Sequence, residues 1–225
     1  MSKIAVSVFN RKGGVGKSTL SIILAEIALV RHNKVLAVDL DPSHNFTDAL
    51  NFMKKFFHDD LRIKSNLEDS DAEAPEDWIV IDCPPRLGEE SDLAMKFSDI
   101  MVIPVRPDFF SLSNLAVTYS NAAKIGKGRA QLPLVKIGYD DSAMAKIANQ
   151  IIQEANYSVA ADIGLHKKIP YNITLGHIWS TGMSALARKP YEKLFEKVEL
   201  AGEKLSSGAK DSEIDDVWRK EAESK

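Results

Sequence analysis

A chain of 225 residues, 44% of them apolar, is long enough to bury one α/β core without a second domain. Its single cysteine, Cys83, excludes an intramolecular disulfide framework and any cysteine-rich metal site, which is typical of a reducing compartment. No segment approaches the roughly 20 apolar residues of a membrane span, and the first residues lead into a strand without a signal-peptide pattern. We therefore expect a single-domain protein of the cytoplasm.

The net charge of -3 hides an uneven distribution of charge along the chain. Residues 39–99 carry 6 Lys/Arg against 16 Asp/Glu, whereas residues 120–200 carry 11 against 7. A local basic patch can bind nucleic acid even in an acidic protein, because binding depends on the charges that meet phosphate. The same asymmetry is also typical of solvated faces, so both interpretations stay open at this point.

Short apolar runs that predict strands alternate with segments of helical periodicity. Strands are predicted at residues 4–9, 35–38, 78–81, 100–105 and 134–137. Helices are predicted at residues 18–31, 47–57, 89–97, 111–125, 142–156 and 183–205. This alternation predicts an α/β fold, a mostly parallel, twisted sheet with helices on both faces. Functional residues of such a sheet gather at the carboxyl ends of its strands, beside the switch in strand order.

The first predicted strand is followed by a glycine-rich loop over residues 10–19 and then by a helix. Glycines lack a Cβ, so the loop can turn with positive φ and point its N–H groups at phosphate oxygens, assisted by the helix N-terminus. Lys17 supplies charge for the terminal phosphates, and the hydroxyl of Ser18 is placed to ligate Mg²⁺. We therefore expect a nucleoside triphosphate site formed by Gly13, Gly14, Val15, Gly16, Lys17, Ser18 and Thr19.

Carboxylates follow the second and third predicted strands. Asp39 and Asp41 are two residues apart and so lie on the same side of an extended chain. Four apolar residues deliver Asp82 to the tip of the next strand, where it can accept a hydrogen bond from Mg²⁺-bound water or from Ser18. An Asp-x-Asp pair alone is equally typical of a loop that caps a strand. Together with the glycine loop, the pattern favours a metal and water network.

The run Lys-Gly-Gly-Val-Gly-Lys-Ser-Thr, residues 12–19, resembles the deviant phosphate loop of the ParA/MinD family of ATPases, of the SIMIBI class. Arg11 stands where the usual phosphate loop has glycine, and Lys12 matches the family's signature lysine. The resemblance covers residues 1–205, which implies a single P-loop NTPase domain. Because the loop begins at residue 10, the chain is most similar to the short plasmid-type ParA proteins, which have no N-terminal helix-turn-helix.

The resemblance also implies roles for individual residues. Asp41 matches the residue that orients the attacking water, Asp39 lies in the Mg²⁺ water shell, and Asn45 is a polar position of the same switch. Pro170 and Asn172 match residues that contact adenine, although a plain turn also favours these two residue types. In the segment after the fourth predicted strand, Phe109 and Phe110 are candidates for core or subunit contact.

By resemblance, the chain is a Mg²⁺-dependent ATPase that cycles between ATP and ADP. ATP would hold a homodimer in which Lys12 of one chain reaches the phosphates bound by the other and stabilises charge in the transition state. The candidate catalytic residues are Lys12, Lys17 and Asp41, and the candidate metal site comprises Ser18, Asp39 and Asp82. Hydrolysis would then release the dimer, so the nucleotide would control assembly.

The family resemblance implies non-specific DNA binding by the ATP dimer and association with the nucleoid. A ParB-like or other centromere-binding or adaptor protein would stimulate hydrolysis, and the system would segregate plasmid or chromosome DNA. Candidate DNA contacts are Arg188, Lys189, Lys193 and Lys197. The last three repeat every four residues, on one helix face, but Glu192 and Glu196 lie between them. A salt-bridged exposed face remains the alternative.

Two other functions stay open. A MinD-like or organelle-positioning ATPase, of the carboxysome type, would have a similar phosphate loop, and a MinD-like protein would need a basic amphipathic C-terminal helix to bind membranes. Residues 201–225 instead carry 5 Lys/Arg against 7 Asp/Glu. We therefore predict a polar, flexible C-terminal tail at residues 206–225 and no membrane partner. A ligase or amidotransferase is the third possibility, but the sequence offers no recognisable nucleophile for one.

Overall fold

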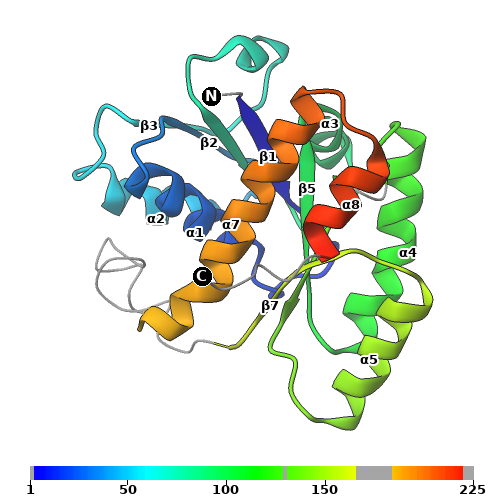
Figure 1. Ribbon diagram of the computed structural model, residues 1–225. Coiled ribbons are helices and arrows are strands. Elements are labelled where there is room, and N and C mark those ends of the chain that lie inside the picture. The colour runs from blue at the N-terminus through cyan, green and yellow to red at the C-terminus, as the bar shows by residue number, and fades with distance from the viewer. Residues whose placement is uncertain (1–2, 129–130, 166–183, 220–225) are drawn as a thin grey trace.

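The computed structural model describes residues 3–128, 131–165 and 184–219 (Figure 1). Within them, seven strands form one sheet in the order β3-β2-β4-β1-β5-β6-β7, and every strand pair is parallel. The strands are β1 (Ile4–Val8), β2 (Val35–Asp39), β3 (Leu61–Lys64), β4 (Trp78–Asp82), β5 (Ile100–Val105), β6 (Leu134–Ile137) and β7 (Val159–Ile163). The parallel α/β fold predicted from the sequence is confirmed.

Helices cover both faces of this sheet. The helices are α1 (Lys17–Val30), α2 (Asn45–Met53), α3 (Glu89–Phe97), α4 (Phe109–Lys124), α5 (Ala143–Glu154), α7 (Ala185–Ser206) and α8 (Asp211–Arg219), with a short 3₁₀ helix η1 (Asp69–Glu73). One buried cluster joins α1, α2, α7 and α8 to one face, and a second cluster joins α3, α4 and α5 to the other. The central strands are therefore buried on both faces, which explains their nearly continuous apolar sequences.

Side chains of strand β1 alternate between the two hydrophobic clusters, one on each face of the sheet. Val6 and Val8 belong to the cluster under α1 and α7, whereas Ala5 and Phe9 belong to the cluster under α3 and α4. Successive side chains of a strand point to opposite faces, so these four apolar residues fill one core or the other. A polar substitution at any of these positions would leave a buried polar group.

The strand order reverses beside β1, which pairs with β4 on one side and β5 on the other. The chain passes from β1 through α1 to β2, and later from β4 through α3 to β5 across β1. Because α1 and α3 cover opposite faces, a crevice opens at the carboxyl ends of these strands. The loop after β1 begins there, as the sequence predicts.

The two edge strands, β3 and β7, were absent from the strands predicted by sequence. Each is only partly buried and carries charged residues, Arg62 and Lys64 in β3 and Asp162 in β7. Edge strands have solvent on one side and therefore lack the apolar run by which central strands are recognised. Their pairing depends on neighbours that are distant in sequence, so only the tertiary structure reveals them.

The chain after residue 206 also differs from the expected polar, flexible tail. Residues 211–219 form α8, and the side chains of Ile214, Val217 and Trp218 are at most 5% exposed. These three positions follow helical spacing and pack on α7 and β7, while Asp215 accepts a hydrogen bond from Ser158 at 2.7 Å. Because this segment is rich in acidic residues, its composition did not indicate the short amphipathic helix that it forms. No helix in the described ranges is both long and apolar enough to cross a membrane.

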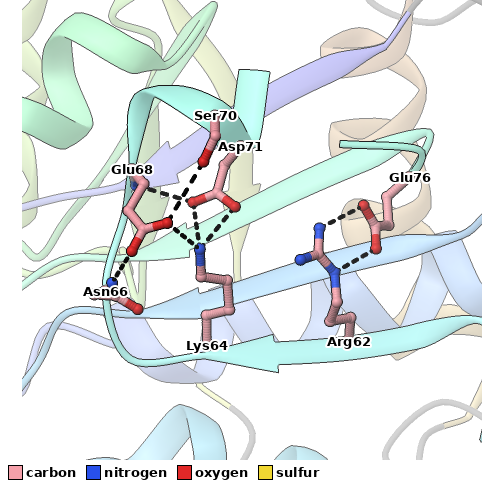
Figure 2. A network of polar contacts seen from close by, with 7 residues as sticks. All are labelled: Arg62, Lys64, Asn66, Glu68, Ser70, Asp71 and Glu76. Carbon is pink, nitrogen blue, oxygen red and sulfur yellow. Dashed lines mark hydrogen bonds and ion pairs between the residues drawn. The ribbon is translucent and has the colours of Figure 1, made fainter. Parts of the chain in front are cut away.

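Two ion pairs attach edge strand β3 to the segment that follows it (Figure 2). The guanidinium of Arg62 donates to both oxygens of Glu76, at 2.6 and 2.9 Å. The ammonium of Lys64 donates to both oxygens of Asp71, at 2.8 Å each, and Asp71 also accepts from the Glu68 amide. Arg62 and Lys64 are two residues apart, so both point from the same face of β3. These pairs attach η1 and its flanking loops to the edge of the sheet.

These pairs predict a stability that weakens in acid. The hydrogen bond from Arg62 holds the pKa of Glu76 below its usual value, although burial opposes this. Burial raises the pKa of Asp71, but the hydrogen bonds from Lys64 and the Glu68 amide outweigh it and lower that pKa. A carboxyl with a depressed folded-state pKa stabilises the fold above its unfolded pKa, and that stabilisation is lost as pH falls through the folded value.

We therefore expect the free energy of urea unfolding to decrease as the pH is lowered below about 4. Each of the two carboxyls should take up as much as about one proton on unfolding. Asp71→Asn should be less stable than wild type at pH 7, and its stability should change less between pH 5 and pH 3. Asp69→Asn, an exposed neighbour in η1, is the matched control and should retain the wild-type pH dependence. Equal profiles for wild type and Asp71→Asn would contradict this account.

Candidate nucleotide-binding site

The loop between β1 and α1 has the backbone geometry of an anion cradle. Gly14 and Gly16 adopt positive φ values of 73° and 100°. Gly16 is the N-cap of α1, and no side-chain oxygen of the described residues caps the first turn of this helix. A Cβ on Gly16 would lie 3.2 Å from Ile137 Cδ1, so a larger residue would strain the turn. The uncapped N–H groups and the helix dipole together favour a bound anion.

Lys17 starts α1 and is only 6% exposed. Burial lowers its pKa, while the negative charges of Asp82 and Asp41 raise it in opposition. Its ammonium donates to the carbonyl of Lys12 at 3.3 Å, so it lies inside the loop. The ammonium of Lys17 is thus a cation near two carboxylates. A bound phosphate oxygen could accept the hydrogen bond that the Lys12 carbonyl accepts in this structure.

Asp82 lies at the centre of the crevice. It ends β4, and in the sheet it is paired with Asp39 of β2 on one side and Val8 of β1 on the other. Burial raises the pKa of Asp82 to about 7, with the charge of Asp39 adding to this. This pKa is lowered in part by hydrogen bonds from the Ser18 and Ser21 hydroxyls and by the positive charge of Lys17. The register of three neighbouring strands therefore places this carboxyl below the loop.

The residues around Asp82 fit a hydrated Mg²⁺ ion. Its Oδ1 accepts a hydrogen bond from Ser21 at 2.9 Å, whereas its Oδ2 is buried without a hydrogen-bond partner among the described residues. A buried carboxylate oxygen left unsatisfied is the acceptor that a metal-bound water requires. Ser18, beside Lys17, would supply the hydroxyl ligand. Within the described residues, no group of three or more acidic, His or Cys side chains is arranged to hold a metal ion by itself, so phosphate oxygens and water would have to complete such a site.

Asp39 and Asp41 organise the loop after β2. Both oxygens of Asp39 accept backbone hydrogen bonds, from Asp41 at 3.1 Å and from Thr47 at 2.8 Å. Asp41 is 8% exposed and accepts from the Ser43 amide at 2.9 Å. Asn45 is exposed and donates to Ser43. The two carboxylates therefore lie together as the Asp-x-Asp spacing predicts, and their roles in hydrolysis stay predictions.

Lys12 points in a different direction from Lys17. Its ammonium lies 2.7 Å from Oδ1 of Asp108, the N-cap residue of α4. Sequence reasoning missed both Asp108 and Ser21. Asp108 has a local signal, since an aspartate three residues before a serine at a helix start is typical of a cap. Ser21 has none, because its partner Asp82 is 61 residues away.

A cavity of about 280 Å³ adjoins the glycine loop. It lies beyond the carboxyl ends of β5, β6 and β7, and α7 closes one side of it. Its lining comprises Gly14, Val15, Gly16, Thr19, Leu20, Arg106, Ile137, Gly164, Leu165 and Tyr191. An apolar cavity continuous with an anion cradle has the chemistry to hold a base and sugar next to phosphates. Pro170 and Asn172, predicted to contact adenine, lie outside the described residues.

The predicted DNA-contact residues all lie on α7. Arg188 is partly buried and Lys189 is exposed. Lys193 lies between two surface grooves, one shared with β7 and one with α8. Lys197 donates to the carbonyl of Trp218 in α8 at 2.7 Å, so its ammonium already has a partner. Lys189 is therefore the most exposed member of the row, and Lys193 is partly buried like Arg188.

Phe109 and Phe110, at the start of α4, are 68% and 67% exposed. They contact each other edge to face, with ring centroids 5.6 Å apart. Of the two expected roles, the core is therefore excluded, and subunit contact stays a prediction. Two large apolar side chains are thus exposed directly after Asp108, the residue that pairs with Lys12.

Comparison with known proteins agrees with this geometry. A sequence model of the AAA domain matches residues 2–68 and 59–132, more than half of the chain. The chain is 29% identical over 162 residues to the sporulation initiation inhibitor protein Soj of Bacillus subtilis, covering 52% of this chain and 63% of that protein. It is 23% identical over 252 residues to the chromosome-partitioning ATPase Soj of Treponema pallidum, covering 88% and 97%.

The fold is also that of a solved MinD protein. The structure of the septum site-determining protein MinD from Pyrococcus horikoshii, complexed with Mg-ADP, superposes with a TM-score of 0.68 at 20% identity, covering 91% of this chain and 99% of that one. At this identity the likeness shows the fold alone. Together with the deviant phosphate loop and the carboxylates aligned below it, the sequence matches show that this chain belongs to the ParA/MinD family of P-loop ATPases.

Proposed function

We propose that this chain is a ParA-like ATPase that binds ATP with Mg²⁺, dimerises, holds non-specific DNA and drives DNA segregation with a partner protein. The observation that carries the proposal is the position of Lys17, a buried lysine among the carboxylates of Asp82 and Asp41 at the mouth of an uncapped helix. A triphosphate would satisfy the lysine and the helix N-terminus at once. The name of the Treponema pallidum relative, a chromosome-partitioning ATPase, supports the cellular role.

Each step of ATP binding and hydrolysis would depend on a different set of residues. Lys17 and the amides of residues 13–19 would bind the phosphates, and the apolar cavity beside the loop would hold the base. Ser18 and Asp82, with Asp39 nearby, would hold Mg²⁺, which neutralises phosphate charge when bound. Asp41 would orient the attacking water. Lys12 of a second copy would add a cation at the transition state, as arginine fingers do elsewhere.

A surface on α7 is the proposed site for DNA, and it would place the protein on the nucleoid in the cytoplasm. Lys189 and Lys193 lie one helical turn apart on the same face. The exposed residues of α8 include Asp211, Glu213 and Asp216, so this helix lacks the basic face of a membrane-binding helix and gives no support to a lipid partner.

Sedimentation with ATP and Mg²⁺, with and without duplex DNA at fixed salt, tests the proposal. Wild type should dimerise and then bind DNA only with ATP, whereas Lys12→Ala should do neither. The double variant Lys189→Glu with Lys193→Glu should dimerise normally but lose DNA, because each change replaces attraction to phosphate by repulsion. Any binding that remains should have a salt slope lower by about 0.9 for each lost phosphate contact. An ATP-bound dimer that stays off DNA at low salt would exclude the partition role, and liposome and organelle-scaffold binding would be examined next.

A matched control separates a local surface from net charge. Lys54→Glu with Lys55→Glu makes the same change of charge at two exposed positions after α2. This variant should retain DNA binding within about threefold. Equal losses in the two double variants would mean that general repulsion, and no particular helix, governs DNA binding.

A further inference from the structure

The signature lysine, Lys12, has a partner within its own chain. Its Nζ lies 2.7 Å from Oδ1 of Asp108, and the two side chains are 31% and 33% exposed. Lys12 belongs to the loop after β1 and Asp108 to the turn after β5, and these two strands are neighbours in the sheet. The ion pair therefore follows from the strand order and joins the two sides of the crevice.

Asp108 is held firmly by α4, which it caps. Its Oδ1 accepts from the Ser111 amide at 3.0 Å, and its Oδ2 accepts from the Ser111 hydroxyl at 2.9 Å. Burial raises the pKa of Asp108, but the hydrogen bonds from Lys12 and Ser111 outweigh it and hold that pKa below its usual value. The helix N-terminus also favours the negative charge. Asp108 is thus a fixed, charged acceptor for the lysine.

The backbone of Lys12 is tied to both the phosphate loop and β5. Its amide donates to Asn10 Oδ1 at 2.8 Å, and Asn10, which is 1% exposed, donates in turn to the Pro104 carbonyl at 2.8 Å. Its carbonyl accepts from the Lys17 ammonium at 3.3 Å. A phosphate that takes the Lys17 ammonium would remove that last bond. Occupation of the loop would therefore change one hydrogen bond of the Lys12 backbone.

We propose that Asp108 is a positioning residue that holds Lys12 on its own protomer when the loop is empty and releases it to the phosphates bound by a second copy. This rests on the proposed function, in which Lys12 acts across a dimer. A partly exposed pair is weak, whereas a triphosphate offers more charge in a more enclosed site, so the lysine can exchange partners. The exposed pair Phe109 and Phe110 directly follows Asp108, so release would occur beside the apolar surface that a second copy could cover.

Asp108→Asn tests the retaining contact, because asparagine is also a good N-cap and α4 should still form. We expect the variant to dimerise at about two- to fivefold lower concentration of the non-hydrolysable analogue AMPPNP with Mg²⁺, measured by sedimentation. Binding of a fluorescent ATP analogue to the monomer at low protein concentration should be unchanged. Ser111→Ala is the matched control, since it removes a hydrogen bond to Asp108 and leaves the Lys12 pair, and it should dimerise as wild type does.

The contact itself can be followed through the carboxyl ¹³C resonance of Asp108. In nucleotide-free protein, Lys12→Gln should raise the pKa of Asp108, and Mg²⁺ with AMPPNP should raise it similarly in wild type. Either value staying unchanged would overturn the proposal, as would a loss of dimerisation in Asp108→Asn. If no nucleotide binds at all, the proposed function fails, whereas the comparison of nucleotide-free wild type with Lys12→Gln still decides whether the pair exists.

Discussion

Lys17→Ala is expected to weaken ATP binding by about 100-fold, since hydrogen bonds to charged groups contribute about 1.5–3 kcal/mol each. The lysine is 6% exposed and lies near the carboxylates of Asp82 and Asp41. Alanine would therefore remove a buried cation that offsets their repulsion of the phosphates. Fluorescence titration with a labelled ATP analogue in the presence of Mg²⁺ measures the effect.

Lys12→Ala is the control for this experiment. It removes an equal charge from the same loop, but its ammonium lies on Asp108, outside the phosphate cradle. Nucleotide affinity of the monomer should stay within about threefold of wild type. If both substitutions weakened binding equally, the loop would attract nucleotide by charge alone, and the distinct positions of the two lysines would carry no functional meaning.

Trp218→Ala is expected to destabilise the protein by about 3–5 kcal/mol, the usual cost of deleting a large buried aromatic side chain. Trp218 is 1% exposed and belongs to the core cluster shared by α1, α7 and α8. A free energy change of this size is a large part of the stability of a typical domain. Urea unfolding followed by circular dichroism measures it directly.

Asp216→Ala supplies the comparison, because Asp216 lies on the exposed face of the same helix. Its effect should remain within about 0.5 kcal/mol of wild type. If Trp218→Ala were equally harmless, α8 would not belong to the folded core, and residues 211–219 would behave as the polar tail that their composition suggests. A large loss confined to Trp218→Ala would establish α8 as part of the domain.

Composition misled at residues 211–219 for a physical reason. Three apolar residues, Ile214, Val217 and Trp218, are few, but their spacing places them on one helix face. A tail is stable as a helix only if a surface receives that face, and α7 with β7 provides one. The same limit applies to β3, where Arg62 and Lys64 look like loop residues until Glu76 and Asp71 are brought beside them.

The sequence by itself determined the phosphate loop, the start of α1 and the carboxylates at the tips of β2 and β4. These features depend on residues that are adjacent in the chain, because glycine freedom, helix capping and an apolar run before an aspartate all act locally. Only the tertiary structure decided which distant groups meet there. Ser21 reaches Asp82, Lys12 pairs with Asp108, and Trp218 enters the core. Such contacts follow from strand order and register, since a parallel sheet brings together strand ends that lie far apart along the chain.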